Sequence, residues 1–394
     1  MFLLLISTVA SAQIAIQAEM IYPVGASPIQ NGVILIENGK IKKIGAAAEI
    51  KIPENYTIQT GKIATPGFID ARTVIGMSGV LNIAVDQDQL EKSSPIQPEL
   101  RAIDAYNPYE TLVSVARSYG VTTIHTGHGI GALVSGQTMI AKTKNGTTDQ
   151  VTINPFCMLA MTIGPSVSEH FSSPGTKAKQ VAMIRTELMK AQQYLKKMTT
   201  TDSNKLPDFD LKMDALSKLL KGEIKAVITA NTAVDIMNAI RLAKAFNFKL
   251  VLDGAAEAYR LTNEIKAAKA EVILHATMAR NEGDMLNMNR ESAAILTAAG
   301  IPVSIESGYE GYVPKTRIVL LEAAVALANG LSFNDALASI TINPAKVLGI
   351  DKKLGSLEIG KDADIVLFNG DPFEYTSQVT AVMIDGEWAF QKSN

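Results

Sequence analysis

The middle of the chain, from residue 63 to 354, alternates short apolar runs with segments of helical periodicity. Continuous apolar runs predict strands that are buried on both faces, as in a parallel sheet whose crossover connections are helices. Apolar residues recur every three or four positions over residues 181–198 and 236–243, which predicts two helices that face a core. The alternation therefore indicates an α/β fold.

Seven runs are predicted as strands of this core. Their number and the length of the region favour a (β/α)8 TIM-type barrel, although the pattern does not place an eighth strand. A doubly wound sheet would also explain the alternation. The predicted strands are Gly67–Asp70, Val121–Ile124, Leu159–Ile163, Val227–Thr229, Leu250–Leu252, Val272–Leu274 and Ile301–Ile305.

The two ends of the chain have a different pattern, of short strands joined by tight turns. Asn38-Gly39 and Asp385-Gly386 are dipeptides typical of two-residue hairpin turns. We expect residues 13–62 and 355–394 to form one small split β-sandwich domain, with the barrel over residues 63–354. This arrangement favours the barrel, because a doubly wound sheet accounts less simply for a domain built from both termini.

Composition narrows the class of protein further. Hydrophobic residues make up 47% and charged residues 19%, which is typical of a globular protein. The net charge of −2 gives no reason to expect nucleic-acid binding. The single cysteine, Cys157, rules out an internal disulfide.

The first twelve residues are predicted to be the remnant of a signal peptide. An apolar run over residues 2–6 is followed by Ala10-Ser11-Ala12, a small-x-small pattern that resembles a cleavage site. We therefore expect export, to the periplasm or the medium, and a cytoplasmic location if the run is only a strand. The run is too short to span a bilayer, and no integral membrane segment is expected.

Two longer segments resemble a known family. Ile63-Ala-Thr-Pro-Gly-Phe-Ile-Asp-Ala71 is similar to the first barrel strand of the amidohydrolase superfamily, and residues 339–365 are similar to its final helix and the return into the β-domain. The likeness is nearest to the imidazolonepropionase-like branch, to which residues 120–123 and 135–138 also look similar. It implies hydrolysis of a carbon–nitrogen bond, assisted by one or two divalent metal ions.

The metal ligands that this resemblance implies are missing. The family's first strand leads into a His-x-His pair, and those two places hold Arg72 and Val74. Thr229 stands about where the next histidine would fall, and Gly308 about where the final aspartate would fall. Because Arg stays protonated and Val has no donor atom, we expect no metal at the usual family site.

Polar side chains nevertheless follow several predicted strands, where they could meet at one barrel mouth. We expect His125 or His275 to act as general base and Arg72 to stabilise an oxyanion or hold an anionic group. Asp253, Glu306 or the loop of Asp86 and Asp88 would orient the base. The predicted catalytic residues are thus His125, His275, Arg72, Asp253 and Glu306, and the predicted substrate-binding residues are Asn231, Asp86, Asp88, His128, Tyr309 and Tyr312.

Three functions remain open at this point. The first is a hydrolase of a small-molecule amide or cyclic amide, with a rebuilt site that lacks the usual metal ligands. The resemblance also implies a homo-oligomer, because barrels similar to this family's commonly self-associate. The second is a non-catalytic barrel that binds a ligand or a partner chain. The third keeps a divalent metal such as zinc at a new site, in which His125 and His128 converge through a turn at Thr126-Gly127.

Overall fold

The computed structural model describes residues 13–81, 83–199, 206–275, 277–310 and 316–392. The predicted signal-peptide remnant, residues 1–12, and Tyr312 lie outside these ranges. In the described part of the chain, no helix combines the length and apolar character needed to cross a membrane.

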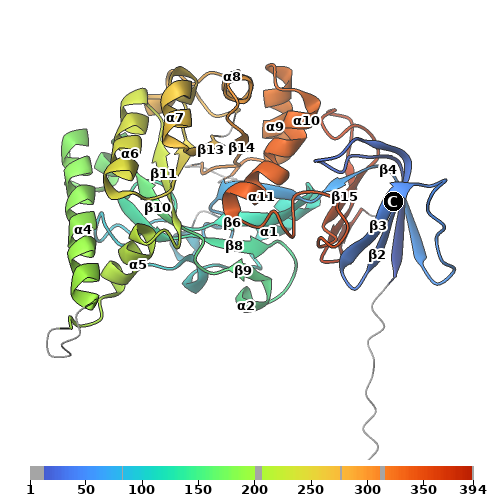
Figure 1. The fold of residues 1–394 in the computed structure, drawn as a ribbon, viewed down its shortest axis with the longest axis horizontal. Coiled ribbons are helices and arrows are strands. Elements are labelled where there is room, and N and C mark those ends of the chain that lie inside the picture. The colour runs from blue at the N-terminus through green and yellow to red at the C-terminus, as the bar shows by residue number, and fades with distance from the viewer. Residues whose placement is uncertain (1–12, 82, 200–205, 276, 311–315, 393–394) are drawn as a thin grey trace, which may run out of the picture.

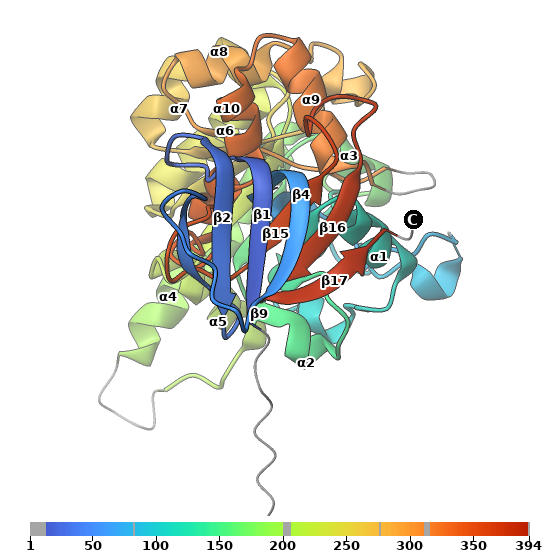
Figure 2. The same ribbon diagram turned by 90° about the vertical axis from the view of Figure 1, so that its right-hand side faces the viewer.

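The two ends of the chain form one seven-stranded mixed sheet. Figure 2 shows it face on, with strands from the N-terminus beside strands from the C-terminus. Both predicted turns are present, with positive φ at Asn38 and Gly39 and at Asp385 and Gly386. A second layer of a sandwich is not confirmed. In spatial order the strands are β17 (Glu387–Gln391), β16 (Val379–Ile384), β15 (Ile365–Phe368), β4 (Thr57–Pro66), β1 (Ile14–Ile21), β2 (Ile29–Glu37) and β3 (Lys40–Ala46).

A six-stranded sheet carries most of the predicted core strands. Its strands β10 to β14 run parallel in chain order, and β7 pairs antiparallel with β10. Nearly every residue in it is buried, as the apolar runs predicted. The order is β14 (Val303–Ile305), β13 (Glu271–Leu274), β12 (Leu250–Gly254), β11 (Lys225–Ala230), β10 (Met158–Thr162) and β7 (Val134–Gln137).

A four-stranded sheet holds the two remaining predicted strands, β5 and β6, which pair in parallel. The antiparallel strand β8 follows β7 after one residue, Thr138, and pairs with β6. Residues 134–142 therefore join the two core sheets, in a TIM-barrel-like arrangement that contains mixed sheets. The order is β5 (Phe68–Thr73), β6 (Val121–Thr126), β8 (Met139–Lys142) and β9 (Thr152–Asn154).

Helices cover the outside of the core sheets (Figure 1). Both predicted amphipathic segments are confirmed within α4 and α6, whose apolar stripes include the buried Ile184, Leu188, Ile236 and Ala239. The helices are α1 (Thr111–Ser118), α2 (Thr148–Val151), α3 (Pro165–His170), α4 (Lys177–Met198), α5 (Leu211–Leu220), α6 (Ala233–Phe246), α7 (Thr262–Ala268), α8 (Ser292–Ala298), α9 (Val319–Ala328), α10 (Phe333–Ser339) and α11 (Ile342–Leu348).

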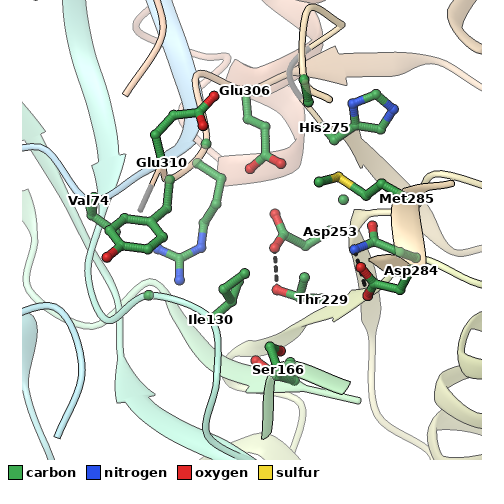
Figure 3. A pocket seen from close by; sticks show the side chains of 18 of the residues that line it. Val74, Ile130, Ser166, Thr229, Asp253, His275, Asp284, Met285, Glu306 and Glu310 are labelled. Carbon is green, nitrogen blue, oxygen red and sulfur yellow. Dashed lines mark hydrogen bonds between the residues drawn. The ribbon is translucent and has the colours of Figure 1, made fainter. Parts of the chain in front are cut away.

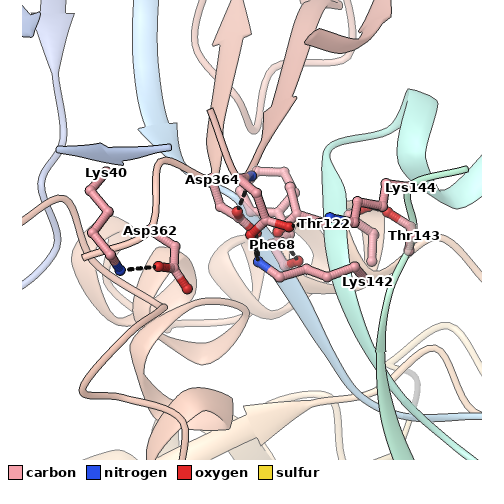
Figure 4. Close-up of polar contacts among 10 residues, drawn as sticks. Lys40, Phe68, Thr122, Lys142, Thr143, Lys144, Asp362 and Asp364 are labelled. Carbon is pink, nitrogen blue, oxygen red and sulfur yellow. Dashed lines mark hydrogen bonds and ion pairs between the residues drawn. The ribbon is translucent and has the colours of Figure 1, made fainter. Parts of the chain in front are cut away.

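A buried ion cluster joins the core to the terminal sheet (Figure 4). Lys142, at the end of β8, lies 2.7 Å from Asp364 and 3.1 Å from Asp385. The Lys142 and Asp364 side chains are only 6% and 4% exposed. Their mutual attraction outweighs burial and raises the pKa of Lys142, so the ammonium stays charged.

Candidate active site

A cavity of about 160 Å³ opens where the parallel strands of the core end. Polar side chains from β11 and β12, and from the residues directly after β13 and β14, line it, as Figure 3 shows. Carboxyl ends of parallel strands lie at the same edge of a sheet, so side chains that are distant in sequence meet here.

Arg72, from the end of β5, provides a positive charge in this pocket. It is 6% exposed, and its guanidinium donates to the carbonyls of Thr73, at 3.3 Å, and His128. Over the described residues, no carboxylate lies within 4 Å of it as an ion-pair partner. The charge of Arg72 also acts on the carboxyl groups of Glu306 and Asp70. A buried cation whose hydrogen bonds go to two carbonyls can still bind an oxygen of a ligand.

Asp253 and Glu306 form a carboxyl pair in the same pocket. Burial, and then the charge and hydrogen bonding of Asp253, raise the pKa of Glu306 well above its usual range. Thr229 donates to Oδ2 of Asp253, while the buried Oδ1 has no hydrogen-bond partner among the described residues. Two adjacent carboxyl groups hold one proton between them most stably, which supplies both a base and an acid.

A second polar group lies on the far side of the pocket. The Asn231 amide donates to Oδ2 of Asp284 at 3.0 Å. His275, which follows β13, lines the pocket too, and its backbone N–H donates to Gly254. Glu282, two residues before Asp284, also lines the pocket.

Asp70 supports the pocket from behind. It is buried and accepts hydrogen bonds from the backbone and hydroxyl of Ser307 and from the backbone of Arg72. Burial outweighs these bonds and raises the pKa of Asp70 to about 7. Because Ser307 directly follows Glu306, this contact fixes the end of β14 against the end of β5.

Comparison with known proteins identifies the chain. The model of the amidohydrolase family matches residues 63–389. The chain belongs to this family. An amidohydrolase from Thermotoga maritima has a closely similar structure, with a TM-score of 0.90 and 28% identity over 96% of this chain and all of that one.

Curated relatives agree with this family. Imidazolonepropionase from Pseudomonas syringae pv. tomato is 24% identical over 87% of this chain and 88% of its own. Amidohydrolase tasK from Hapsidospora irregularis is 25% identical over 91% of this chain, but this chain spans only 40% of that longer protein. Together with the family match, these relatives support a hydrolase that acts on carbon–nitrogen bonds.

The family implies a divalent metal, and a structure of an adenosine deaminase from Xanthomonas campestris, 16% identical with a TM-score of 0.56, has bound zinc. The residues of this amidohydrolase do not fit such an ion. No group of three histidine, cysteine, aspartate or glutamate side chains is placed to hold a metal anywhere in the described ranges. The guanidinium of Arg72 lines the pocket where a ligand histidine was expected.

The prediction that His125 is a base or a metal ligand does not fit the structure. His125 is fully buried on β6 and does not line the pocket. Its Nδ1 bonds to the Ala71 carbonyl at 2.7 Å and its Nε2 to the Thr138 hydroxyl at 2.7 Å. Burial and the Arg72 charge lower the pKa of His125 to about 3, so the ring stays neutral and structural.

The prediction that His128 binds substrate or a metal does not fit the structure either. It is buried, it is not part of the described pocket lining, and it contacts the pocket only through its carbonyl, which holds Arg72. Burial and the Arg72 charge lower the pKa of His128 to about 4. With no carboxylate completing a set of three ligands in the described chain, the pair His125 and His128 does not form the expected metal site.

The predicted loop residues Asp86 and Asp88 lie outside the described pocket lining. Asp86 accepts from the Ile83 backbone at 3.0 Å and Asp88 is exposed, so both belong to the loop's own structure. The loop reaches the pocket through Gln89 instead, whose amide donates to the hydroxyl of Tyr309 at 3.4 Å. Tyr309 lines the pocket, as predicted.

Sequence reasoning missed three residues of the site: Asp284, Ser307 and Gln89. Asp284 lies in the loop after β13, ten residues beyond the last residue of that strand, and no local motif marks it. Ser307 could have been found, because it adjoins Glu306 at a strand end. Gln89 lies in the same loop as Asp86 and Asp88. The sequence favoured the carboxylates of this loop as site residues, and nothing in the local pattern distinguished the amide of Gln89.

Proposed function

We propose that this amidohydrolase hydrolyses a non-peptide amide or cyclic amide bond of a small molecule without a metal centre. The observation that carries the proposal is one pocket in which a buried carboxyl pair accompanies a buried guanidinium that has no ion-pair partner within 4 Å among the described residues. The imidazolonepropionase relatives support the carbon–nitrogen bond class. His275 is the alternative base, since it lines the same pocket.

The proposed reaction uses three groups. Asp253 takes a proton from a water molecule through Oδ1 as the water oxygen attacks the carbonyl carbon. Arg72 stabilises the negative charge that develops on the carbonyl oxygen. Glu306, protonated because its pKa is raised, donates its proton to the leaving nitrogen as the C–N bond breaks. The proton now on Asp253 restores the shared pair.

A substrate panel tests this function. We expect the wild type to hydrolyse at least one lactam, cyclic imide or open-chain amide, and Arg72→Gln to lower kcat about 10²–10³-fold through the lost oxyanion stabilisation. Arg101→Gln is the matched control, because Arg101 is exposed and pairs with Asp104. If the wild type binds a panel amide and hydrolyses none, the non-catalytic binding barrel replaces the hydrolase.

The pH dependence of the reaction follows from Glu306. The acid must be protonated, so kcat/KM should fall as pH rises through the pKa of Glu306, which is raised above the ordinary carboxyl range. Glu306→Gln should remove this alkaline limb together with most of the rate. Asp70→Asn is the control, because the pKa of Asp70 is also raised, to about 7. If the alkaline limb disappears in Asp70→Asn, the titrating group is Asp70 and not Glu306.

We also propose a closed barrel for the core, a division of the chain into two domains, self-association and export. Two observations support an eight-membered barrel with one antiparallel strand. Residues 134–142 pair with both β6 and β10, and a bridge joins Thr73 to Gly308. We assign the barrel to residues 63–354 and the β-domain to residues 13–62 and 355–394. Self-association and export through a signal within residues 1–12 are further proposals.

A further inference from the structure

The carboxamide of Asn231 has one buried atom without a hydrogen-bond partner among the described residues. Asn231 follows β11, lines the pocket and is 7% exposed. Its nitrogen donates to the Asp284 carboxylate, whereas its buried Oδ1 has no hydrogen-bond partner in the described chain. If the nitrogen and oxygen of the side-chain amide were exchanged, the oxygen would face the Asp284 carboxylate, and two acceptors would repel each other. The atom without a hydrogen-bond partner is therefore the oxygen, Oδ1.

Gly254, on the neighbouring strand, leaves room for this oxygen itself. Its φ of +73° lies in the left-handed region, and a Cβ built there would stand 2.6 Å from Oδ1 of Asn231. A side chain at this position would therefore displace the Asn231 amide. An unpartnered buried acceptor is costly unless a ligand donates to it.

The charge on this wall indicates which donor fits. The loop after β13 brings the carboxyl side chains of Glu282 and Asp284 to the described pocket lining, together with the guanidinium of Arg280. In Figure 3, Asp284 lies across the pocket from Val74, the close chain neighbour of Arg72. One side of the pocket thus presents the Asp284 carboxylate beside the Asn231 acceptor, and Arg72 lines another part of it.

We propose that the substrate carries a planar cation rich in N–H groups, an amidinium or guanidinium, which binds Oδ1 of Asn231 and the carboxylate of Asp284. An oxygen acceptor at its other end faces Arg72. Planar N–H forks match a carboxylate and an amide oxygen side by side. This inference names the substrate class and rests on the proposed function, but it concerns binding alone.

Calorimetric titration of the full chain with two probes tests it. The probes are 4-guanidinobutanoate and 4-ureidobutanoate, which have closely similar shapes and differ in charge. We expect the guanidino probe to bind at least about tenfold more tightly, because charge-assisted hydrogen bonds are about twice as strong as neutral ones. Asp284→Asn and Asn231→Leu should each reduce the ratio of the two dissociation constants toward one.

Asp214→Asn is the matched control, since Asp214 pairs with Lys218 on the surface of α5, and it should leave the ratio unchanged. If Asp284→Asn fails to fold, Asn231→Leu alone carries this part of the test. Equal binding of the two probes, tighter binding of the ureido probe, or no binding of either overturns the inference. None of these results touches hydrolysis in the substrate panel, whereas absence of turnover with a preserved guanidino preference overturns the proposed function alone.

Discussion

Asp253→Asn is expected to lower kcat on any amide that the wild type hydrolyses about 10²–10⁴-fold, the usual contribution of a general base. Asparagine keeps the shape of the side chain and an oxygen that can accept from Thr229. It removes the negative charge and the basic oxygen, Oδ1, that lacks a partner in the described chain. The loss should appear in kcat measured at saturating substrate, with KM changed far less.

Stability separates this loss from simple misfolding. A buried carboxyl pair is costly, because both groups leave water and repel each other when ionised. Asp253→Asn should therefore melt no lower than the wild type, and Asp214→Asn on the surface should change neither rate nor melting. A kcat within about threefold of the wild type would exclude Asp253 as the base and transfer that role to His275.

Lys142→Met is expected to destabilise the protein by about 3–5 kcal/mol, the typical cost of removing one partner of a buried ion pair. Methionine has a similar length, so the change removes the charge and leaves little empty space. Asp364, 4% exposed, would remain without its counterion. Denaturant unfolding at neutral pH measures this loss as a lower midpoint concentration.

A second lysine offers a control close by. Lys40 pairs with Asp362 at 2.6 Å (Figure 4), but its side chain is 53% exposed. Lys40→Met should cost no more than about 1 kcal/mol, because water screens exposed pairs. Equal destabilisation by the two substitutions would contradict the view that the Lys142 cluster holds the core to the terminal sheet.

The alternating apolar runs were sufficient to predict the parallel strands and the pocket that they form. Asp253, Glu306 and Asn231 were predicted from one rule, that carboxyl ends of parallel strands share an edge, and the structure brings all three to one cavity. Arg72 was predicted from the family motif, and it lies in the same cavity. The positions of the three strand-end residues depend only on the direction of the strands, which the alternating pattern predicts.

His125 shows where such reasoning fails. It also ends a strand, but residues 134–142 run antiparallel beside it and bring Thr138 against its ring. That segment contains glycine, serine and glutamine, so its pattern did not predict a strand. Asp284 was missed for a different reason, because its position depends on how a long loop folds back over the pocket, which local spacing does not encode.

The central claim is that Arg72 and the carboxyl pair act where relatives of this amidohydrolase use a metal. The most direct test is hydrolysis of a substrate found in the amide panel by protein that has been treated with a chelator and checked by elemental analysis. We predict that kcat stays within about twofold of the untreated value and that added zinc does not raise it. Loss of activity on chelation, with recovery on addition of zinc, would contradict the claim.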